Sequence, residues 1–514
     1  MSYQTLIDSP IERYLIYKQT AERYRIIQLG ITIFTKQPPT TTTSSPQYTA
    51  LPYNFYIFPY EEYNNNQFNM DISSILFNKS HGIDFNKWIK QGVSYVNNEQ
   101  LKRISEHLFN DNINKYTPSN RNVYKRITLY KKSDQEKYEQ FLTKFYEFYT
   151  NTSLKEMTYE KMPRHIMLYF INELPDNIID TIYISNESRN TVKICKVSKD
   201  EKQLKIRHDD IIIANSIRNA KGVKNIFDCI IDKKKIVVGH NCIMDLMFCY
   251  THFLGGLPEE YEVFKKKVKS EFHKVFDTKY IYITLQTKLN SNSGSDGNTN
   301  SDSNVDAVTL PPDKPFHLED LFKYFYNKYK DKVNITTPST VDINNTTVHY
   351  EDYLSSIDKS KFHNADYDSF VTGCAYVYML EEFTHEAVDA HSFKFNLIGS
   401  IYNCMNLNSV NDNVFAVENT NAFIIKQKAG DGGNNELDKV ISNSMSNGIQ
   451  KVYFYEKDKS IVAFVNKECN FVNEINQCSN MLEALTLDEY KERNKMEKKE
   501  RKKNNFKQNN NIKK

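Results

Sequence analysis

Residues 235–248 read KIVVGHNCIMDLMF, and this stretch decides the fold. Its first part, KIVV, predicts a short buried strand that ends in Gly239-His240-Asn241. The apolar run after these residues predicts a helix. In open α/β sheets, ligands bind where a strand ends and the following helix begins. The stretch therefore predicts an α/β protein with a candidate site at the end of this strand.

Asp245 is the acid inside this run. Its neighbours are all apolar: Ile243, Met244, Leu246, Met247 and Phe248. An acid in a helix that is apolar on nearly all sides needs a partner, and a metal ion is one way to supply it. An N-cap or a surface acid of an amphipathic helix is the competing interpretation. Taken alone, the local sequence favours that competing interpretation.

A second candidate site is His363-Asn-Ala-Asp-Tyr-Asp368, which stands directly before the strongly helical run Ser369–Leu380. At this offset His363 and Asp368 can flank one metal site, with the carboxylate on the metal and the imidazole near the attacking water. The alternative is an ordinary helix N-terminus, where Asp366 and Asp368 interact favourably with the helix dipole. A third feature, Asp277-Thr278-Lys279, is interpreted as the start of a strand with a cation, or as a surface turn.

Bulk composition excludes several classes of protein. A chain of 514 residues is too long for one compact domain, and about two to four domains are expected. With a net charge of +3, any contact with nucleic acid must come from local patches. The eight cysteines form no CxxC pair and no Cys/His cluster, which argues against a zinc module or a disulfide scaffold and indicates a reducing compartment. Neither a secretory signal nor a membrane span is expected.

The rest of the chain alternates strands and helices. Strands are expected at Arg25–Thr35, Asn54–Phe58, Thr181–Ser185, Thr191–Val197, Ala422–Gln427, Lys451–Tyr455 and Ser460–Asn466. Helices are expected at Asp71–Lys90, Glu99–Asn110, Glu136–Tyr149, Pro163–Asn172, Asp209–Ile231, Leu318–Tyr329 and Ala365–Glu382, and between the strands at 422–427 and 451–455. By composition, Gln37–Ala50 is a loop, Asn290–Ser303 a mobile insert and Lys491–Lys514 a disordered basic tail.

Several motifs, in this order, resemble the poly(A)-specific ribonuclease family. They are IERY…IIQLGITIF, NFYIFP, SHGIDFNKWIKQGVSYV, KIVVGHNCIMDLMF, VFDTK, HNADYDSFVTGCAY and, near the end, LDEYKERNKMEKK. That family is a deadenylase branch of the ribonuclease-H-like DEDD 3′-exonucleases, of the subtype that bears a histidine. The resemblance spans nearly the whole chain, and the order GHN-x3-D, DTK, H-x-A-x-x-D is a specific combination.

The resemblance implies an α/β fold with a ribonuclease-H-like mixed sheet flanked by helices, from which the first strand is missing. An inserted small α+β domain that binds single-stranded nucleic acid would occupy residues 130–205. The nuclease domain would then comprise residues 1–129 and 206–400, with a flexible insert at 289–312. A C-terminal RNA-recognition-like α+β module would follow at 415–487, and a basic tail at 491–514.

The resemblance also implies roles for individual residues. Asp245 and Asp368 match the third and fourth of the family's metal-binding acids, and His363 matches the general base. Three further matches concern RNA. Lys279 matches a lysine that holds the RNA backbone, and His240 and Asn241 lie in the motif that shapes the site. Tyr455 falls near the aromatic residue that stacks on the cap base. The implied chemistry is hydrolysis with two Mg²⁺ ions, acting on RNA and the poly(A) tail. The resemblance also implies a cap contact, a homodimer, and residence in the nucleus and the cytoplasm. No association with a membrane is expected.

Three departures from the family pattern stand out. The family opens with a strand bearing Asp-x-Glu well before IERY, whereas here IERY starts at Ile11 and no Asp-x-Glu precedes it. Arg164 and His165 are adjacent, although the inserted domain's signature places an Arg and a His four residues apart. The family has Trp where Tyr455 stands. Two hypotheses follow: a 3′→5′ exoribonuclease whose gene was read incompletely, or a non-catalytic RNA-binding relative that has lost the first metal-binding motif.

Overall fold

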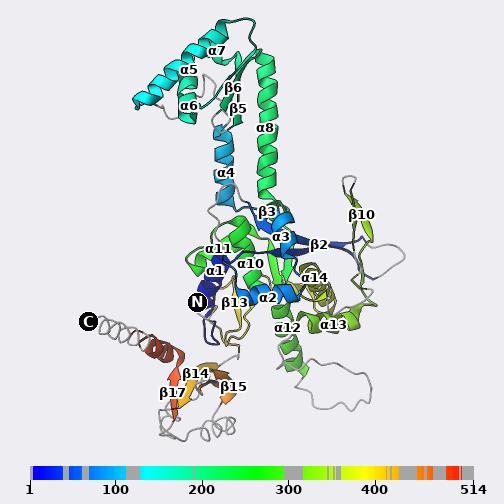
Figure 1. Cartoon of the computed structure of the whole chain (residues 1–514). Helices are drawn as coiled ribbons and strands as arrows, with labels where there is room; N and C mark the ends of the chain where they lie inside the picture. The colour runs from blue at the N-terminus through cyan, green and yellow to red at the C-terminus, as the bar shows by residue number, and fades with distance from the viewer. Residues whose placement is uncertain are drawn as a thin grey trace, which may run out of the picture.

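The computed structural model describes residues 4–496 and Lys499, with internal gaps. The gaps fall at 39–44, 61–68, 112–127, 189–190, 294–316, 344–345, 351–352, 355–360, 413, 417–419, 428–448, 456–459 and 467–481. Most of the expected insert at 290–303 and the helix expected between the strands at 422–427 and 451–455 therefore lie outside the described residues. The fold is mixed α/β, as expected (Figure 1).

The main sheet is built around a long hairpin. Strand β1 (Gln28–Lys36) pairs antiparallel with β2 (Gln47–Pro59), so the tract that was expected to be a loop up to Ala50 is strand from Gln47 onward. Strand β2 also pairs in parallel with β3 (Val93–Tyr95) and β9 (Asn334–Thr336). Strand β2 is the centre of the sheet because it pairs with three other strands, and alternate side chains along much of it are buried.

A second sheet has two strands and contains the first part of the stretch KIVVGHNCIMDLMF. Strand β7 (Ile236–Gly239) pairs in parallel with β8 (Lys274–Asp277). In the described part of the chain, β1 has no neighbour on the edge away from β2, and β7 has none on the edge away from β8. The expected mixed sheet is thus divided into two pieces, and within the described residues β1 and β7 each have an edge without a neighbouring strand.

Helix α14 (Ala365–Glu382) joins the two sheets, and its bounds agree with the sequence prediction. Gly30 of β1 allows the closest approach, since a Cβ atom there would lie 1.8 Å from the Ala365 carbonyl oxygen. Two hydroxyls, Oγ1 of Thr32 and Oγ of Ser369, lie 2.7 Å apart across the same interface. One apolar core contains side chains of α14 together with partly buried Phe34 of β1 and Val238 of β7. The helix therefore packs on both open-edged pieces.

Helices α1 (Pro10–Arg23), α10 (Ile243–Cys249) and α11 (Tyr261–Glu271) form the other large core. Helix α1 begins with a capping box between Ser9 and Glu12. Arg13 is almost fully buried, and its guanidinium donates to the carbonyl oxygens of Ile398 and Gly399 at 3.1 and 2.6 Å. A turn nearly 400 residues away in sequence is thereby fixed to the first helix.

Two long helices, α4 (Asn98–Asp111) and α8 (Lys199–Lys221), lead to a separate unit seen at the top of Figure 1. This unit has its own apolar core, with Phe141, Phe145, Phe170 and Ile194 fully buried. Its elements are α5 (Lys132–Thr150), β4 (Glu156–Tyr159), α6 (Arg164–Glu173), α7 (Asp176–Ile179), β5 (Ile182–Ser188) and β6 (Thr191–Lys196). The strands pair in the order β4-β6-β5.

The C-terminal residues form a four-stranded antiparallel sheet in the order β15-β16-β14-β17. Its strands are β14 (Thr420–Gln427), β15 (Ile449–Tyr455), β16 (Ser460–Asn466) and β17 (Leu482–Thr486). Phe464 of β16 packs on Phe415, with ring centroids 5.9 Å apart, and joins the core of α1 and α10. A helix follows at 487–496, and its Lys491 Nζ lies 2.6 Å from Glu12 Oε2. The prediction of disorder from Lys491 onward is therefore wrong for the first residues of the tail.

Two long predicted helices are broken at glycines. The helix expected over Asp71–Lys90 is divided into α2 (Ile72–Ser80) and α3 (Phe85–Gln91), with Gly82 between them at φ +80°. The helix expected over Asp209–Ile231 ends at Gly222, which has φ +47° and lies against Ser94; α9 (Lys224–Asp232) follows. Only glycine adopts such backbone angles without strain, so both breaks follow from the residue type.

The remaining elements connect these parts. They are η3 (Tyr250–Leu254), α12 (Thr278–Ser293), α13 (Leu318–Tyr329), β10 (Thr340–Ile343), β11 (Thr346–His349), α15 (His385–Asp389), β12 (Lys394–Asn396) and β13 (Cys404–Asn406). Within the described ranges, no helix is both long enough and apolar enough to cross a membrane.

Candidate active site

Asp245 stands in the first turn of α10, directly after β7. Its side chain is exposed to solvent on one side, yet it lies deep among protein atoms. The pKa of Asp245 is raised to about 6, mainly by desolvation and to a smaller extent by the negative charge of Asp277. No described residue donates a hydrogen bond to it. Asp245 is therefore an acid whose charge the surrounding protein leaves uncompensated.

Asp277 is fully buried at the end of β8. Its Oδ1 accepts hydrogen bonds from the backbone N–H groups of Asn241, Lys279 and Tyr280 at 2.7, 3.1 and 3.5 Å. Its Oδ2 accepts from the backbone N–H of Asn396 at 3.0 Å. Desolvation raises the pKa of Asp277 to about 6 even though these donors oppose the shift. Both sequence interpretations of this segment, strand start and surface turn, are wrong, because the carboxylate ends a strand and ties three chain segments together.

His240 and Asn241 shape the turn between β7 and α10. His240 Nδ1 lies 3.0 Å from the Thr278 hydroxyl, which can donate to the Gly239 carbonyl oxygen at 3.2 Å. This arrangement places the imidazole proton on Nδ1. Desolvation, together with the positive charge of nearby Lys279, lowers the pKa of His240 to about 3, so the ring is neutral.

Asn241 adopts φ +54°, and its side-chain oxygen accepts from the Asn396 amide at 2.9 Å. Its backbone N–H is the donor at 2.7 Å to Asp277. Lys279 is the second residue of α12 and is half-buried, and desolvation lowers the pKa of its ammonium group although Asp277 opposes this. These residues therefore hold the end of β7 in one fixed conformation beside a lysine.

His363 and Asp368 are brought together at the start of α14. The backbone N–H of His363 donates to Asp368 Oδ1 at 3.2 Å, and His363 has the left-handed φ of +75°. The His363 ring is exposed, while Asp368 is half-buried. Desolvation raises the pKa of Asp368, against the opposing effect of the His363 N–H and charge. An imidazole and a carboxylate thus occupy one end of α14.

Two rings on α2 contact His363, and sequence reasoning missed both. The His81 ring centroid lies 4.5 Å and the Phe77 centroid 5.5 Å from that of His363, each in an edge-to-face arrangement. The only available signal was the motif SHGIDF, which lies 280 residues before His363 and carries no local indication of this contact.

The two acid-bearing groups stand on opposite sides of the break between the sheets. Asp245 follows β7, whereas Asp368 and His363 lie beside β1, through the contacts of Ala365 with Gly30 and of Ser369 with Thr32. No contact links Asp245 to Asp368 among the described residues. Nor do those residues include a group of three or more His, Cys, Asp or Glu side chains placed to hold a metal ion. The convergence of Asp245 with His363 and Asp368 on one metal stays a prediction.

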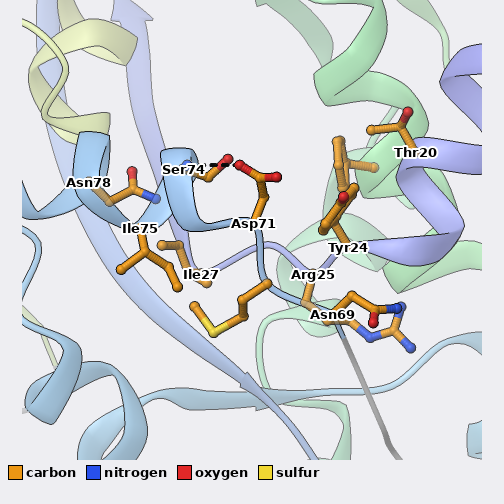
Figure 2. Close-up of a pocket in the computed structure, with 11 residues that line it drawn as sticks. Thr20, Tyr24, Arg25, Ile27, Asn69, Asp71, Ser74, Ile75 and Asn78 are labelled. Carbon is orange, nitrogen blue, oxygen red and sulfur yellow. Dashed lines mark hydrogen bonds between the residues drawn. The ribbon is translucent and has the colours of Figure 1, made fainter. Parts of the chain in front are cut away.

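A cavity of about 370 Å³ lies between the junction of α1 and β1, the start of α2, and α10 (Figure 2). It is lined by Thr20, Tyr24, Arg25, Ile27, Asn69, Met70, Asp71, Ser74, Ile75, Asn78 and Phe248. Phe248 belongs to α10, the helix that carries Asp245, but none of the candidate site residues lines the cavity. The carboxylate of Asp71 is already engaged as the N-cap of α2, where it accepts from the backbone N–H groups of Ser73 and Ser74.

The predicted contact residue Tyr455, and the Arg164-His165 pair that departs from the family signature, lie outside this region. Tyr455 ends β15 and pairs in register with Ser460, but its side chain lies outside the described residues. In the separate unit at 132–196, His165 Nε2 lies 3.1 Å from Asp134 Oδ2, so the imidazole adjacent to Arg164 is engaged within that unit.

Comparison with known proteins points to one kind of enzyme. Residues 2–376 match the family described as CAF1 family ribonuclease. The chain is 25% identical over 385 residues to the pre-piRNA 3′-exonuclease trimmer of Bombyx mori, covering 73% of this chain and 62% of that protein. It is 26% identical over 298 residues to the poly(A)-specific ribonuclease PNLDC1 of Pongo abelii, covering 56% and 52%. The poly(A)-specific ribonuclease PARN of Arabidopsis thaliana is 24% identical over 410 residues, covering 71% and 55%. The chain thus spans between half and two thirds of the length of these relatives.

Proposed function

The chain belongs to the CAF1 family of ribonucleases, and from this premise we propose that it is a 3′→5′ exoribonuclease of the poly(A)-specific type. It would shorten poly(A) tails or trim RNA 3′ ends by two-metal hydrolysis. The observation that carries the proposal is the placement of Asp245 on one side of the sheet break and of His363 and Asp368 on the other.

The acids present fit a divalent cation. Asp245 has no donor among the described residues, and its pKa is raised, so a bound cation would supply the missing compensation. Mg²⁺ is commonly held by one or two carboxylates together with substrate phosphates and water. Asp245 and Asp368 would therefore hold Mg²⁺, which when bound activates water and stabilises the leaving oxygen. His363, exposed beside Asp368, would take the proton from the attacking water.

Two further carboxylates are needed for a full two-metal site, because two acids offset the repulsion between two divalent ions poorly. We propose that an extended segment bearing Asp-x-Glu lies in the break and pairs with the open edges of β1 and β7. In a strand, two residues separated by one share a face, so both carboxylates would enter the site together. With this position unfilled, RNA binding is expected to persist while turnover is slight.

RNA contacts are proposed for several regions. Lys279, whose ammonium is half-buried beside the end of β7, would hold the RNA backbone. His240 and Asn241 would act by fixing the turn, since His240 Nδ1 is engaged with Thr278 and the Asn241 side-chain oxygen with Asn396, while His240 Nε2 is buried with no hydrogen-bond partner among the described residues.

The strand order β15-β16-β14-β17 supports an RNA-recognition-like module, in which Tyr455 would stack on RNA or on the cap base. The separate α+β unit at 132–196 would bind single-stranded RNA. Homodimerisation and residence in nucleus and cytoplasm are further proposals.

A non-catalytic RNA-binding pseudo-nuclease is the alternative. The observation that favours it is the absence, within the described part of the chain, of any group of three or more side chains arranged for a metal ion. Such a protein would compete for RNA tails without cutting them.

The deciding experiment follows release of 5′-AMP from oligo(A) RNA in the presence of Mg²⁺. The chain itself is expected to bind the RNA with trace release. A version extended at the N-terminus by an Asp-x-Glu strand is expected to release AMP, and Asp245→Ala or Asp368→Ala should abolish this. A folded extended version that binds RNA and releases nothing would establish the alternative. Rapid release by the chain alone would contradict the need for further carboxylates.

A further inference from the structure

The His363 ring is exposed and lacks polar support. His363 has a left-handed backbone conformation, which residues other than glycine adopt only where the surrounding structure imposes it. No described residue donates or accepts a hydrogen bond at its imidazole, and the bond to Asp368 uses the backbone N–H of His363. A general base must nevertheless be held within a narrow range of orientations, because small displacements of reacting groups cost large factors in rate. The orientation must therefore come from packing.

That packing comes from α2. Phe77 lies in α2 and His81 is its C-cap, and their ring centroids are 4.1 Å apart, so the two rings stand side by side at the end of this helix. Their rings meet the His363 ring at interplanar angles of 77° and 71°. Edge-to-face contact is a favoured arrangement for aromatic rings and restricts rotation of the partner. His81 is the nearer of the two.

The His81 ring is itself fixed. Its Nδ1 lies 2.8 Å from the Phe77 carbonyl oxygen, at the C-terminal end of α2. A carbonyl oxygen only accepts, so Nδ1 carries a proton in either charge state of the ring. Ser80 adds a second contact, with Oγ 3.2 Å from the same nitrogen. A ring anchored in this way can hold another ring in place.

We infer that His81 is a positioning residue that orients the His363 imidazole at the candidate site. The inference rests on the proposed function, because it assigns a purpose to the orientation of the proposed base. His81 contacts the ring of His363, and the backbone N–H of His363 donates to Asp368, so His81 stands at the same end of α14 as this carboxylate. Helix α2 has no buried residue, and the ring contact is one of its contacts with the start of α14, which His363 directly precedes.

The test measures motion of the His363 ring by NMR of the full chain labelled with ¹³C at histidine Cε1. His81→Ala should increase the mobility of His363, because the supporting ring is gone. His81→Phe should keep most of the order, because an aromatic edge remains. Ile72→Ala, on the exposed N-terminal turn of α2, is the matched control and should behave as the unmodified chain does.

The same variants, made in the Asp-x-Glu-extended version, are compared by single-turnover cleavage of oligo(A). His81→Ala should lower the rate about tenfold at unchanged RNA affinity, and His81→Phe by no more than about threefold. An equally ordered His363 ring in His81→Ala would overturn the inference, even where Asp245→Ala abolishes cleavage. His81→Phe as defective as His81→Ala would contradict positioning by ring contact. Absence of cleavage in every version would overturn the proposed function, while the ring mobility still decides the inference.

Discussion

The two sides of the candidate site are built in opposite ways. On the side of β7, β8 and α10, a fully buried Asp277 accepts four backbone hydrogen bonds and fixes the turn beside Asp245. On the side of α2 and α14, an exposed His363 is held by the edges of two rings, and α2 has no buried residue. The first side fixes the backbone beside its acid by the buried polar contacts of Asp277, and the second holds its base by surface packing.

This difference shows how the proposed work is divided. Asp245 lies where burial and a second carboxylate disfavour its charge, so it is suited to receive a cation from outside. His363 lies where water and a substrate have access. Four predictions test the comparison, starting with the largest expected effect.

Asp245→Asn in the Asp-x-Glu-extended version should reduce AMP release to background, because a neutral amide cannot compensate a divalent cation. The same change should not lower the free energy of unfolding at pH 7, since it removes an uncompensated charge near Asp277. AMP release and thermal unfolding are measured on the same preparation. A loss of stability that parallels the loss of activity would make Asp245 a structural acid.

Asp277→Ala should destabilise the fold by about 3 kcal/mol or more, because it leaves buried backbone N–H groups without an acceptor. Urea unfolding provides the measurement. Asp389→Ala is the control. The Asp389 carboxylate lies 2.7 Å from Nζ of Lys274, which is on the same strand as Asp277, but it is half exposed. Its loss should therefore change the free energy of unfolding by no more than about 1 kcal/mol. Equal effects of the two substitutions would contradict the assigned role of Asp277.

The pH dependence of the free energy of unfolding should report the protonation of Asp245 and Asp277. Asp245 and Asp277 have pKa values near 6 in the folded chain, against 3.8 for an unperturbed carboxyl. The folded state therefore keeps protons that the unfolded state has lost, and the contribution of this pair to stability falls as pH rises from about 4 to about 6. Asp245→Asn should flatten this fall. An unchanged slope in urea unfolding at pH 4, 5, 6 and 7 would show that Asp245 is not perturbed.

Phe77→Ala should change the free energy of unfolding by no more than about 1 kcal/mol, because half of this side chain is exposed. The measurement is urea unfolding beside Asp277→Ala. A cost as large as that of Asp277→Ala would mean that α2 belongs to the buried framework and that the two sides are alike.

Sequence alone predicted the features that depend on neighbouring residues. The apolar strand and the helix around Asp245 follow from a local pattern, and α14 begins and ends where its periodicity indicated. The burial of Asp277 could not be predicted in this way, because it depends on the backbone of Asn396, 119 residues later. The contact of His81 with His363 likewise joins segments that no local pattern relates.

The central claim is that Asp245 and Asp368 hold metal at one site across the sheet break. The most direct test adds Mn²⁺ and oligo(A) to the chain labelled with ¹³C at histidine Cε1 and measures paramagnetic broadening of the His363 signal. The claim predicts strong broadening that is lost both in Asp245→Ala and in Asp368→Ala, since each acid would hold metal beside the same imidazole. Broadening that persists unchanged in Asp245→Ala would show that the two sides do not form one site.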